Sequence, residues 1–321
     1  MNVYATLQLN LTMERTMKKV TMKDIALEAN VSVATVSYII NNVKTQTIPQ
    51  ETRERVLEIV KRLNYVPNLA ARSLVKQKTG LMGILVNREE NQGFWRRFHY
   101  ADFISELEGL LAKKGYHVLL YSLDAENPNP QIILERKLDG VFLIDPSEES
   151  FHNISRQFPL VPLVVIDSHI DDPLFFKVLP DFKSAMANAI QFSTDREFVL
   201  VVEKYNNLGI IKTLYRESGL EPDNIFTMSN EADLKHFLSI HKGKKVIAVN
   251  EFIGVVVAKY AETKDMIVIC TSGCPEILPM ACDKITFTRT KAVIAEDIMA
   301  KILEDDQVDK LDKFVYLVPS E

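Results

Sequence analysis

From residue 81 onward, short apolar runs alternate with longer stretches of helical periodicity, and this alternation constrains the fold more than any other feature. Strands that alternate with helices form parallel sheets with helices on both faces. Because about 240 residues exceed the usual size of one such sheet, we expect a two-lobed, doubly wound α/β body over residues 80–321. The expected strands are 81–86, 117–121, 140–144, 163–166, 197–202, 246–249, 266–269 and 284–288.

Residues 18–67 have a different pattern, which predicts a small all-helical domain. Thr21 and Asp24 have the spacing of a capping box that starts a first helix. Asn30 stands where a tight turn needs a positive φ, and Ser32 is a suitable N-cap for a second helix. Pro49 fits the first turn of a third helix, which carries an apolar stripe.

Two further segments lie outside these domains. Residues 1–17 match no periodic pattern, and we expect either a disordered extension or a true start at Met17. Residues 68–79 contain a short apolar helical stretch and end in a polar Lys-Gln-Lys-Thr-Gly sequence. We expect a hinge helix and linker there.

Composition places the chain among ordinary globular proteins. Apolar residues make up 47% and charged residues 25%, which excludes a disordered tail, a collagen-like fibre and a coiled-coil rod. No apolar run approaches the roughly 20 residues of a membrane helix. The chain begins without a secretory pattern, and three cysteines do not suggest a disulfide framework. We therefore expect a cytoplasmic protein with no membrane association, no metal and no cofactor.

Charge is distributed unevenly along the chain. Residues 1–80 carry a formal charge of +6, while the whole chain carries −5, so the remainder carries −11. A basic domain on an acidic body suggests a polyanionic partner for the basic part. A solvated helical surface explains the same charges, and charge alone does not separate the two interpretations.

The first two predicted helices flank a short turn at Ala29–Ser32 and have the dimensions of a helix-turn-helix. Thr35, Ser37 and Tyr38 share the face of the second helix that is left outside the core. Short hydroxyl side chains on such a face suit phosphate oxygens and base edges.

These segments also carry a family resemblance. The sequences VTMKDIALEANVSVATVSYIINN, ETRERVLEIVKRLNYVPNLAARSL and TGLMGILV, between Val20 and Val86, resemble the head and hinge of the lactose-repressor/galactose-repressor family of bacterial transcription factors. The rest of the chain matches only in its rhythm of strands and helices. The resemblance implies a repressor that binds a near-palindromic double-stranded DNA operator as a homodimer, or as a dimer of dimers.

The resemblance also assigns roles in the recognition helix. Val33, Ala34 and Tyr38 fall at base-reading positions, and Thr35 and Ser37 at positions that contact the DNA backbone. Many members carry arginine at the position of Tyr38, and tyrosine cannot make the bidentate contact to guanine. We therefore expect a different half-site. The alternative for Val33 and Ala34 is an ordinary exposed helix surface.

Further roles fall at the end of the head and in the hinge. Tyr65 and Asn68 would touch phosphate, although Tyr65 could instead only pack against the third helix. Leu74 occupies the position of a leucine that enters the minor groove and kinks the central step. Ala71 would let paired hinge helices approach each other, and Arg72 belongs to the hinge motif.

Ligands of two-lobed sheets bind between the lobes, beyond the carboxyl ends of the strands. The residues that follow the predicted strands are therefore the candidate effector-binding residues, with two aromatic side chains that could stack on a ligand. They are Asn87, Arg88, Phe94, Trp95, Asp145, Asp167, Asn206, Asn250, Glu251, Ser272 and Arg289. The alternative for Trp95, the single tryptophan, is a place in the core.

Departures from the family pattern make a sugar effector doubtful. Asn206 stands near the position of the family's sugar-binding arginine, and 270–273 (Cys-Thr-Ser-Gly) replaces an acidic pair. Arg289 could replace the lost cation or form a surface ion pair. The pocket could therefore take another small metabolite.

We interpret the chain as a transcriptional regulator modulated by a small molecule, and two alternatives remain. The same DNA-binding head could act with a body that serves only dimerisation or control by a protein partner. A sugar-binding carrier shares the expected body, but lacks a basic head. An enzyme is disfavoured because the chain has no phosphate-binding loop and no nucleophile or metalloprotease motif, and its histidines are scattered.

Overall fold

The computed structural model describes residues 20–40, 47–65, 78–88, 93–124, 135–193, 197–304 and 311–320. The chain divides into two compact units, Met1–Val75 and Lys76–Glu321, which we call the head and the body. This division falls within the segment 68–79 that the sequence predicts to join them. The expected extension 1–17 and most of the joining segment lie outside the described residues.

Three short helices form the described part of the head: α2 (Met22–Ala29), α3 (Val33–Ile40) and α4 (Gln50–Arg62). The capping box at the start of α2 is confirmed, because the backbone N–H of Thr21 donates to the Asp24 carboxylate at 2.8 Å and Asp24 N–H donates back to the Thr21 hydroxyl. Asn30 has φ 51°, as the turn requires. Pro49 is the N-cap of α4 and not part of its first turn, since that helix begins at Gln50.

The head has its own apolar core, to which all three helices contribute. Because helices of this length are marginal in water alone, their stability depends on this shared core. The buried residues are Ile25, Ala26, Ala29, Val36, Ile39, Val56 and Ile59.

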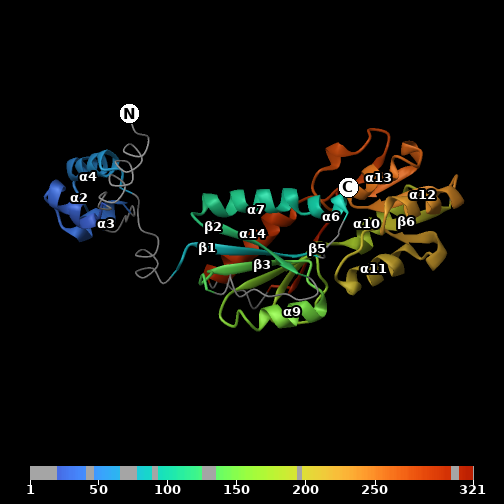
Figure 1. Ribbon diagram of the computed structural model, residues 1–321, viewed down its shortest axis with the longest axis horizontal. Helices are drawn as coiled ribbons and strands as arrows, with labels where there is room; N and C mark the ends of the chain where they lie inside the picture. Colours follow the sequence, from blue (N-terminus) through green and yellow to red (C-terminus); the bar gives the residue numbers. More distant parts are fainter. Residues whose placement is uncertain are drawn as a thin grey trace, which may run out of the picture. The chain divides into compact units, whose positions relative to one another are not determined.

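The body contains two parallel sheets, each the centre of one lobe (Figure 1). The first lobe has six strands in the order β11-β5-β4-β3-β1-β2, and the second has five in the order β10-β9-β8-β6-β7. The strands of the first sheet are β1 (Leu81–Arg88), β2 (His117–Asp124), β3 (Gly140–Ile144), β4 (Leu163–Ile166), β5 (Phe176–Pro180) and β11 (Phe314–Leu317). Those of the second are β6 (Phe198–Val202), β7 (Ile225–Thr227), β8 (Lys245–Val249), β9 (Met266–Ile269) and β10 (Asp283–Ile285).

Helices cover both faces of each sheet, as a doubly wound fold requires. In the first lobe, α7 and α14 pack on one face and α9 on the other. In the second lobe, α12 and α13 cover one face and α10 and α11 the other. Their bounds, with the short α6, are α6 (Phe94–Phe98), α7 (Ala101–Lys113), α9 (Glu148–Ser155), α10 (Phe182–Gln191), α11 (Leu208–Ser218), α12 (Glu231–Ile240), α13 (Glu251–Val257) and α14 (Lys291–Glu304).

The chain passes between the lobes twice, after β5 and after β10, and backbone hydrogen bonds hold the segment after β11 beside both crossings. Asp181 N–H donates to the Leu317 carbonyl at 2.9 Å, immediately after β5 and at the end of β11. Thr288 N–H donates to the Val318 carbonyl at 3.0 Å, in the segment between β10 and α14. The carboxyl ends of the two sheets meet at this boundary, where residues that follow strands of both sheets are in contact.

Candidate functional sites in the head and between the lobes

Helix α3 presents one side to the head core and the other to solvent. Val36 is buried, whereas Val33 is 41% and Tyr38 is 37% exposed. Ser32 precedes the helix, and its hydroxyl accepts a hydrogen bond from the backbone N–H of Thr35 at 3.0 Å. The outer face of α3 is therefore accessible to a partner.

The other head residues singled out from the sequence lie at different depths. Ala34 is exposed, and Thr35 and Ser37 are half-buried on α3. Tyr65 packs, half-buried, against the head core. The hinge candidates lie outside the described residues; they are Asn68, Ala71, Arg72 and Leu74.

In the body, polar residues from both lobes meet in a fully buried ion network. Arg96 on α6 pairs with Asp145, which follows β3 in the first lobe, and with Glu203, which follows β6 in the second, at 2.9 Å. His99 Nδ1 lies 2.5 Å from Glu203 Oε2. Arg96 and His99 thus hold the second lobe against the first through one carboxylate.

The network continues toward α14 through Asp167, the residue after β4. Lys291 Nζ lies 2.5 Å from Asp167 Oδ2, and His99 Nε2 lies 3.7 Å from the same oxygen. The backbone at Asp145 and Asp167 has φ 50° at both residues. Aspartate tolerates this left-handed conformation better than most residues, which explains why it follows both strands.

Two amides extend the network, one within the second lobe and one across the lobe boundary. Asn250, which follows β8, donates to Glu203 at 2.7 Å. Asn206 donates its side-chain N–H to Asp145 Oδ2 at 3.0 Å, and its backbone N–H to Asp145 Oδ1 at 3.2 Å. Every hydrogen bond between Asn206 and Asp145 joins the second lobe to the first.

The pKa values follow from the pairing of these charges. Burial raises the pKa of Glu203, but His99 and Arg96 outweigh it and hold the pKa at about 2. Burial likewise opposes ionisation of Asp167, yet Lys291 and His99 lower its pKa below the usual value. For His99, burial lowers the pKa, and the neighbouring carboxylates raise it above the usual value.

These shifts describe a balanced set of charges. Arg96, Lys291 and protonated His99 supply three positive charges, and three carboxylates oppose them. An unpaired charge in such a buried place is costly, so the network is stable only when it is close to neutral. The protonated form of His99 provides this neutrality.

The structure brings most of the sequence-derived effector candidates to this region, but in contact with each other. Asn87 donates to the Asp145 carbonyl at 3.4 Å. Glu251 accepts the backbone N–H groups of the loop 272–274, including Ser272 N–H at 2.8 Å. The protein's own side chains therefore occupy the place where the strand ends meet.

Four candidates stand apart from the network. Trp95 packs against the core of the second lobe, and Arg88 is half-buried at the end of β1. Arg289 forms an exposed ion pair with Asp297. The side chain of Phe94 lies outside the described part of the structure.

The sequence analysis missed the four groups that complete the network: Arg96, His99, Glu203 and Lys291. Glu203 directly follows the predicted strand 197–202, so the rule that selected Asp145 and Asp167 could have found it. Arg96 and His99 had no comparable signal, because Arg96 lies on the short helix α6 and His99 directly follows it.

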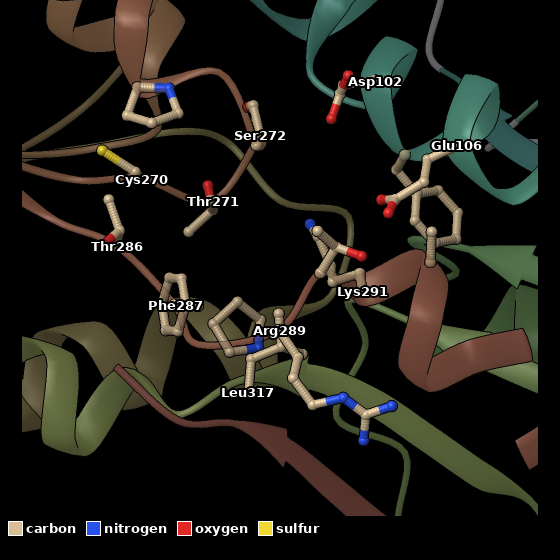
Figure 2. A pocket seen from close by; sticks show the side chains of 16 residues that line it. Asp102, Glu106, Cys270, Thr271, Ser272, Thr286, Phe287, Arg289, Lys291 and Leu317 are labelled. Atoms are coloured by element: carbon tan, nitrogen blue, oxygen red, sulfur yellow. The ribbon is translucent and has the colours of Figure 1, made fainter. Parts of the chain in front are cut away.

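A cavity of about 210 Å³ lies beside the network and is open to solvent. Figure 2 shows Asp102 and Glu106 of α7 on one side of it and the loop carrying Thr271 and Ser272 on the other. Phe287 and Leu317 form an apolar part of the wall. Both lobes therefore contribute to this cavity.

No group of three or more potential metal ligands occurs among the described residues. Within the same residues, no helix is both long and apolar enough to span a membrane.

Comparison with known proteins gives a family match that lies in the head. Residues 21–68, which contain α2–α4, match the family described as bacterial regulatory proteins, lacI family. Catabolite control protein A of Staphylococcus epidermidis is 32% identical over 182 residues, which is 55% of this chain and 53% of that protein. The family match therefore concerns the head of the chain.

Two further curated relatives match a similar share of the chain. The sucrose operon repressor of Klebsiella pneumoniae is 35% identical over 47% of this chain and 49% of its own length. The transcriptional repressor PurR of Aliivibrio salmonicida is 32% identical over 50% of this chain and 47% of its own length. The chain thus spans about half the length of the curated relatives it matches.

Solved structures extend the likeness to nearly the whole chain. The lac repressor dimer bound to operator and the anti-inducer ONPF has a TM-score of 0.70 at 14% identity, over 94% of this chain and 97% of that chain. A complex of the transcriptional regulator CelR with cellobiose has a TM-score of 0.55 at 19% identity, over 94% and 97%. At such identities the likeness concerns the fold, and it confirms the expected fold class: a helical head and a two-lobed α/β body.

Proposed function

We propose that this chain is a lacI-family, sequence-specific DNA-binding transcriptional regulator, acting as a repressor, and not an enzyme. It binds a near-palindromic operator as a homodimer. The observation that carries the proposal is the capped three-helix head, in which α3 turns Val33, Ala34 and Tyr38 away from the core. A recognition helix exposed in this way suits the major groove.

The test is selection of source-genome fragments by the purified full chain at a stated salt concentration, followed by sequencing. We expect a near-palindrome with a kinkable central step, since symmetric half-sites mirror a symmetric dimer. Sedimentation of the free protein and of its complex measures the dimer separately. Recovery of unrelated fragments, bound without sequence preference and with an affinity that falls as salt rises, would contradict the proposal.

Tyr38→Arg tests the base-reading role of α3. Arginine can make the bidentate guanine contact that tyrosine cannot, so the selected half-site should change at one or two positions. Leu57→Gln, at an exposed position of α4, is the matched control and should select the wild-type site. An unchanged half-site for Tyr38→Arg would remove Tyr38 from the readout.

The hinge contributes a second prediction about DNA. In the proposed mechanism, residues 69–75 form a helix on operator DNA, and Leu74 enters the minor groove. The apolar side chain replaces stacking lost at the kinked step. Leu74→Ala should weaken operator binding far more than non-specific binding. Equal losses in both would refute the insertion of Leu74 into the minor groove.

We place the regulatory site of the body at the boundary between the lobes. A ligand that contacts both lobes changes their arrangement only through unequal affinity for the open and closed states. One observation favours a second candidate function, control of the same head without a ligand: the protein's own ion network fills the centre of this boundary. Screening metabolites for a change in operator affinity separates the two candidates.

A further inference from the structure

The cavity beside the ion network has a chemical character of its own. The network excludes a ligand from the place where Arg96, His99 and Glu203 meet, because these side chains are buried against each other. The cavity of about 210 Å³ lies nearer to the connection between the lobes and is open. One small molecule in this cavity can touch both lobes.

The positive charges of this cavity are already paired. Lys291 is held by Asp167 within the network, at 2.5 Å. Arg289 is held by Asp297 on the surface. Neither cation is available to an anionic ligand unless an existing ion pair breaks.

The negative charges of the cavity, in contrast, are unpaired. Asp102 and Glu106 are one helical turn apart on α7, and both line the cavity (Figure 2). Within the described parts of the chain, neither carboxylate has an ion-pair or hydrogen-bond partner. A cation entering the cavity would meet two free carboxylates.

The opposite wall supplies an unused hydroxyl. Ser272 is 3% exposed and lines the cavity, yet its Oγ has no hydrogen-bond partner among the described residues. A buried polar atom without a partner is unfavourable, so this hydroxyl favours a ligand that donates a hydrogen bond. The neighbouring Thr271 hydroxyl is likewise buried without a hydrogen-bond partner among the described residues.

The two walls come close together at one point. Gly273 has φ +87°, and a Cβ at this position would lie 2.7 Å from Asp102 Oδ2. Glycine thus permits the loop of the second lobe to approach α7 of the first. The free carboxylate and the unused hydroxyl consequently lie on facing walls of the same cavity.

We infer that this cavity binds a small organic cation, a primary ammonium group on a compact apolar body, as the effector of the regulator proposed above. The ammonium group donates to Asp102, Glu106 and Ser272, and the apolar body packs on Phe287 and its neighbours. The cavity holds about seven water molecules by volume, which limits the ligand to a small size. Anionic effectors such as phosphorylated or acidic metabolites are excluded by charge.

A matched series of three probes tests the charge requirement directly. Benzylamine, benzyl alcohol and benzoate share one ring and differ in having a positive, neutral or negative group. Titration calorimetry on the full chain should show binding of benzylamine at millimolar concentration or better, weaker binding of the alcohol and none of benzoate. Equal affinities for the three probes, or no binding of benzylamine in this range, would overturn the inference.

Variants then locate the site. The double variant Asp102→Asn/Glu106→Gln should lose at least tenfold in affinity for benzylamine, because it removes charge-assisted hydrogen bonds. Glu108→Gln, an exposed carboxylate on the same helix, is the control and should stay within twofold. Ser272→Ala should weaken the binding of benzylamine severalfold, and benzyl alcohol should still bind more weakly than benzylamine. An unchanged affinity of the double variant would overturn the inference.

This inference rests on the proposed function, but the two fail in different ways. Calorimetry measures the cavity without DNA, and fragment selection measures the head without a ligand. Operator binding with no benzylamine binding contradicts the effector class alone. Benzylamine binding that requires Asp102 and Glu106, with no operator recovered, contradicts the regulator proposal alone.

Discussion

Glu203→Gln is the substitution that most directly tests the ion network between the lobes. Glutamine keeps the size of the side chain and removes its charge. Arg96 would then keep only Asp145, and His99 would keep only Asp167 at 3.7 Å. Two buried cations would share one fewer carboxylate, so the body should become less stable.

The magnitude follows from the pKa of Glu203. A carboxyl whose pKa falls from 4.5 in the unfolded chain to about 2 in the folded chain contributes about 3 kcal/mol at neutral pH. This contribution is present above pH 4.5 and is lost as the pH falls toward 2. Removal of one partner from a buried pair costs about 3–5 kcal/mol in other proteins, which agrees. For a body of this size, 3 kcal/mol corresponds to a fall of about 6–12 °C in melting temperature.

Trp95 makes the measurement specific to the lobe boundary. It is the single tryptophan of the chain, and it lies on α6 against the core of the second lobe. Urea unfolding at pH 7, followed by tryptophan fluorescence, should give the lower stability for Glu203→Gln. Asp297→Asn, which removes an exposed ion pair with Arg289, is the control and should cost less than about 1 kcal/mol. If both variants lost the same small amount of unfolding free energy, the network would not hold the lobes together.

Three further predictions concern other groups. The stabilisation that protonated His99 provides should be complete below its unfolded pKa of about 6.5 and should be lost as the pH rises through its raised folded pKa. The free energy of unfolding of His99→Gln, measured from pH 6 to 9, should therefore vary less with pH than that of the wild type. Thr21→Ala should destabilise the head by about 1 kcal/mol, seen in its thermal unfolding by circular dichroism, whereas Thr47→Ala should not. Because burial raises the pKa of Cys274 to about 12, its alkylation at pH 8 should be far slower than that of a free thiol, and rapid labelling of Cys274 in the folded protein would contradict this.

Sequence pattern predicted the fold well where it produced long, uniform signals. The strands β3, β4 and β9 have the predicted bounds, because each is an apolar run with turn residues at its end. The strands β5, β7 and β11 were not predicted. β7 has only three residues, and β5 contains a lysine whose amine reaches the backbone carbonyls of Asp172 and Phe175. A pattern of apolar residues cannot anticipate such a local solution.

The candidate site could be predicted only in part, for a related reason. Residues that follow a parallel strand must lie at the carboxyl edge of the sheet, so Asp145, Asp167 and Asn250 could be placed from the sequence. Arg96 and His99 reach the same edge from α6, and nothing in their spacing indicates this. Whether Asp145 faces a ligand or an arginine of its own chain depends on that tertiary placement.

The network also changes what an effector has to do. In a body whose lobes are held apart by unpaired charges, a ligand would have to supply the charges that close it. Here Arg96 and His99 already join Glu203 to the first lobe, so closure needs no added charge. A ligand in the adjacent cavity then alters the equilibrium between arrangements only by contacts that one arrangement makes and the other lacks, such as those from α7 to the loop at Ser272. A small cation of modest affinity can meet this requirement, because the contacts of Arg96 and His99 with Glu203 already join the lobes.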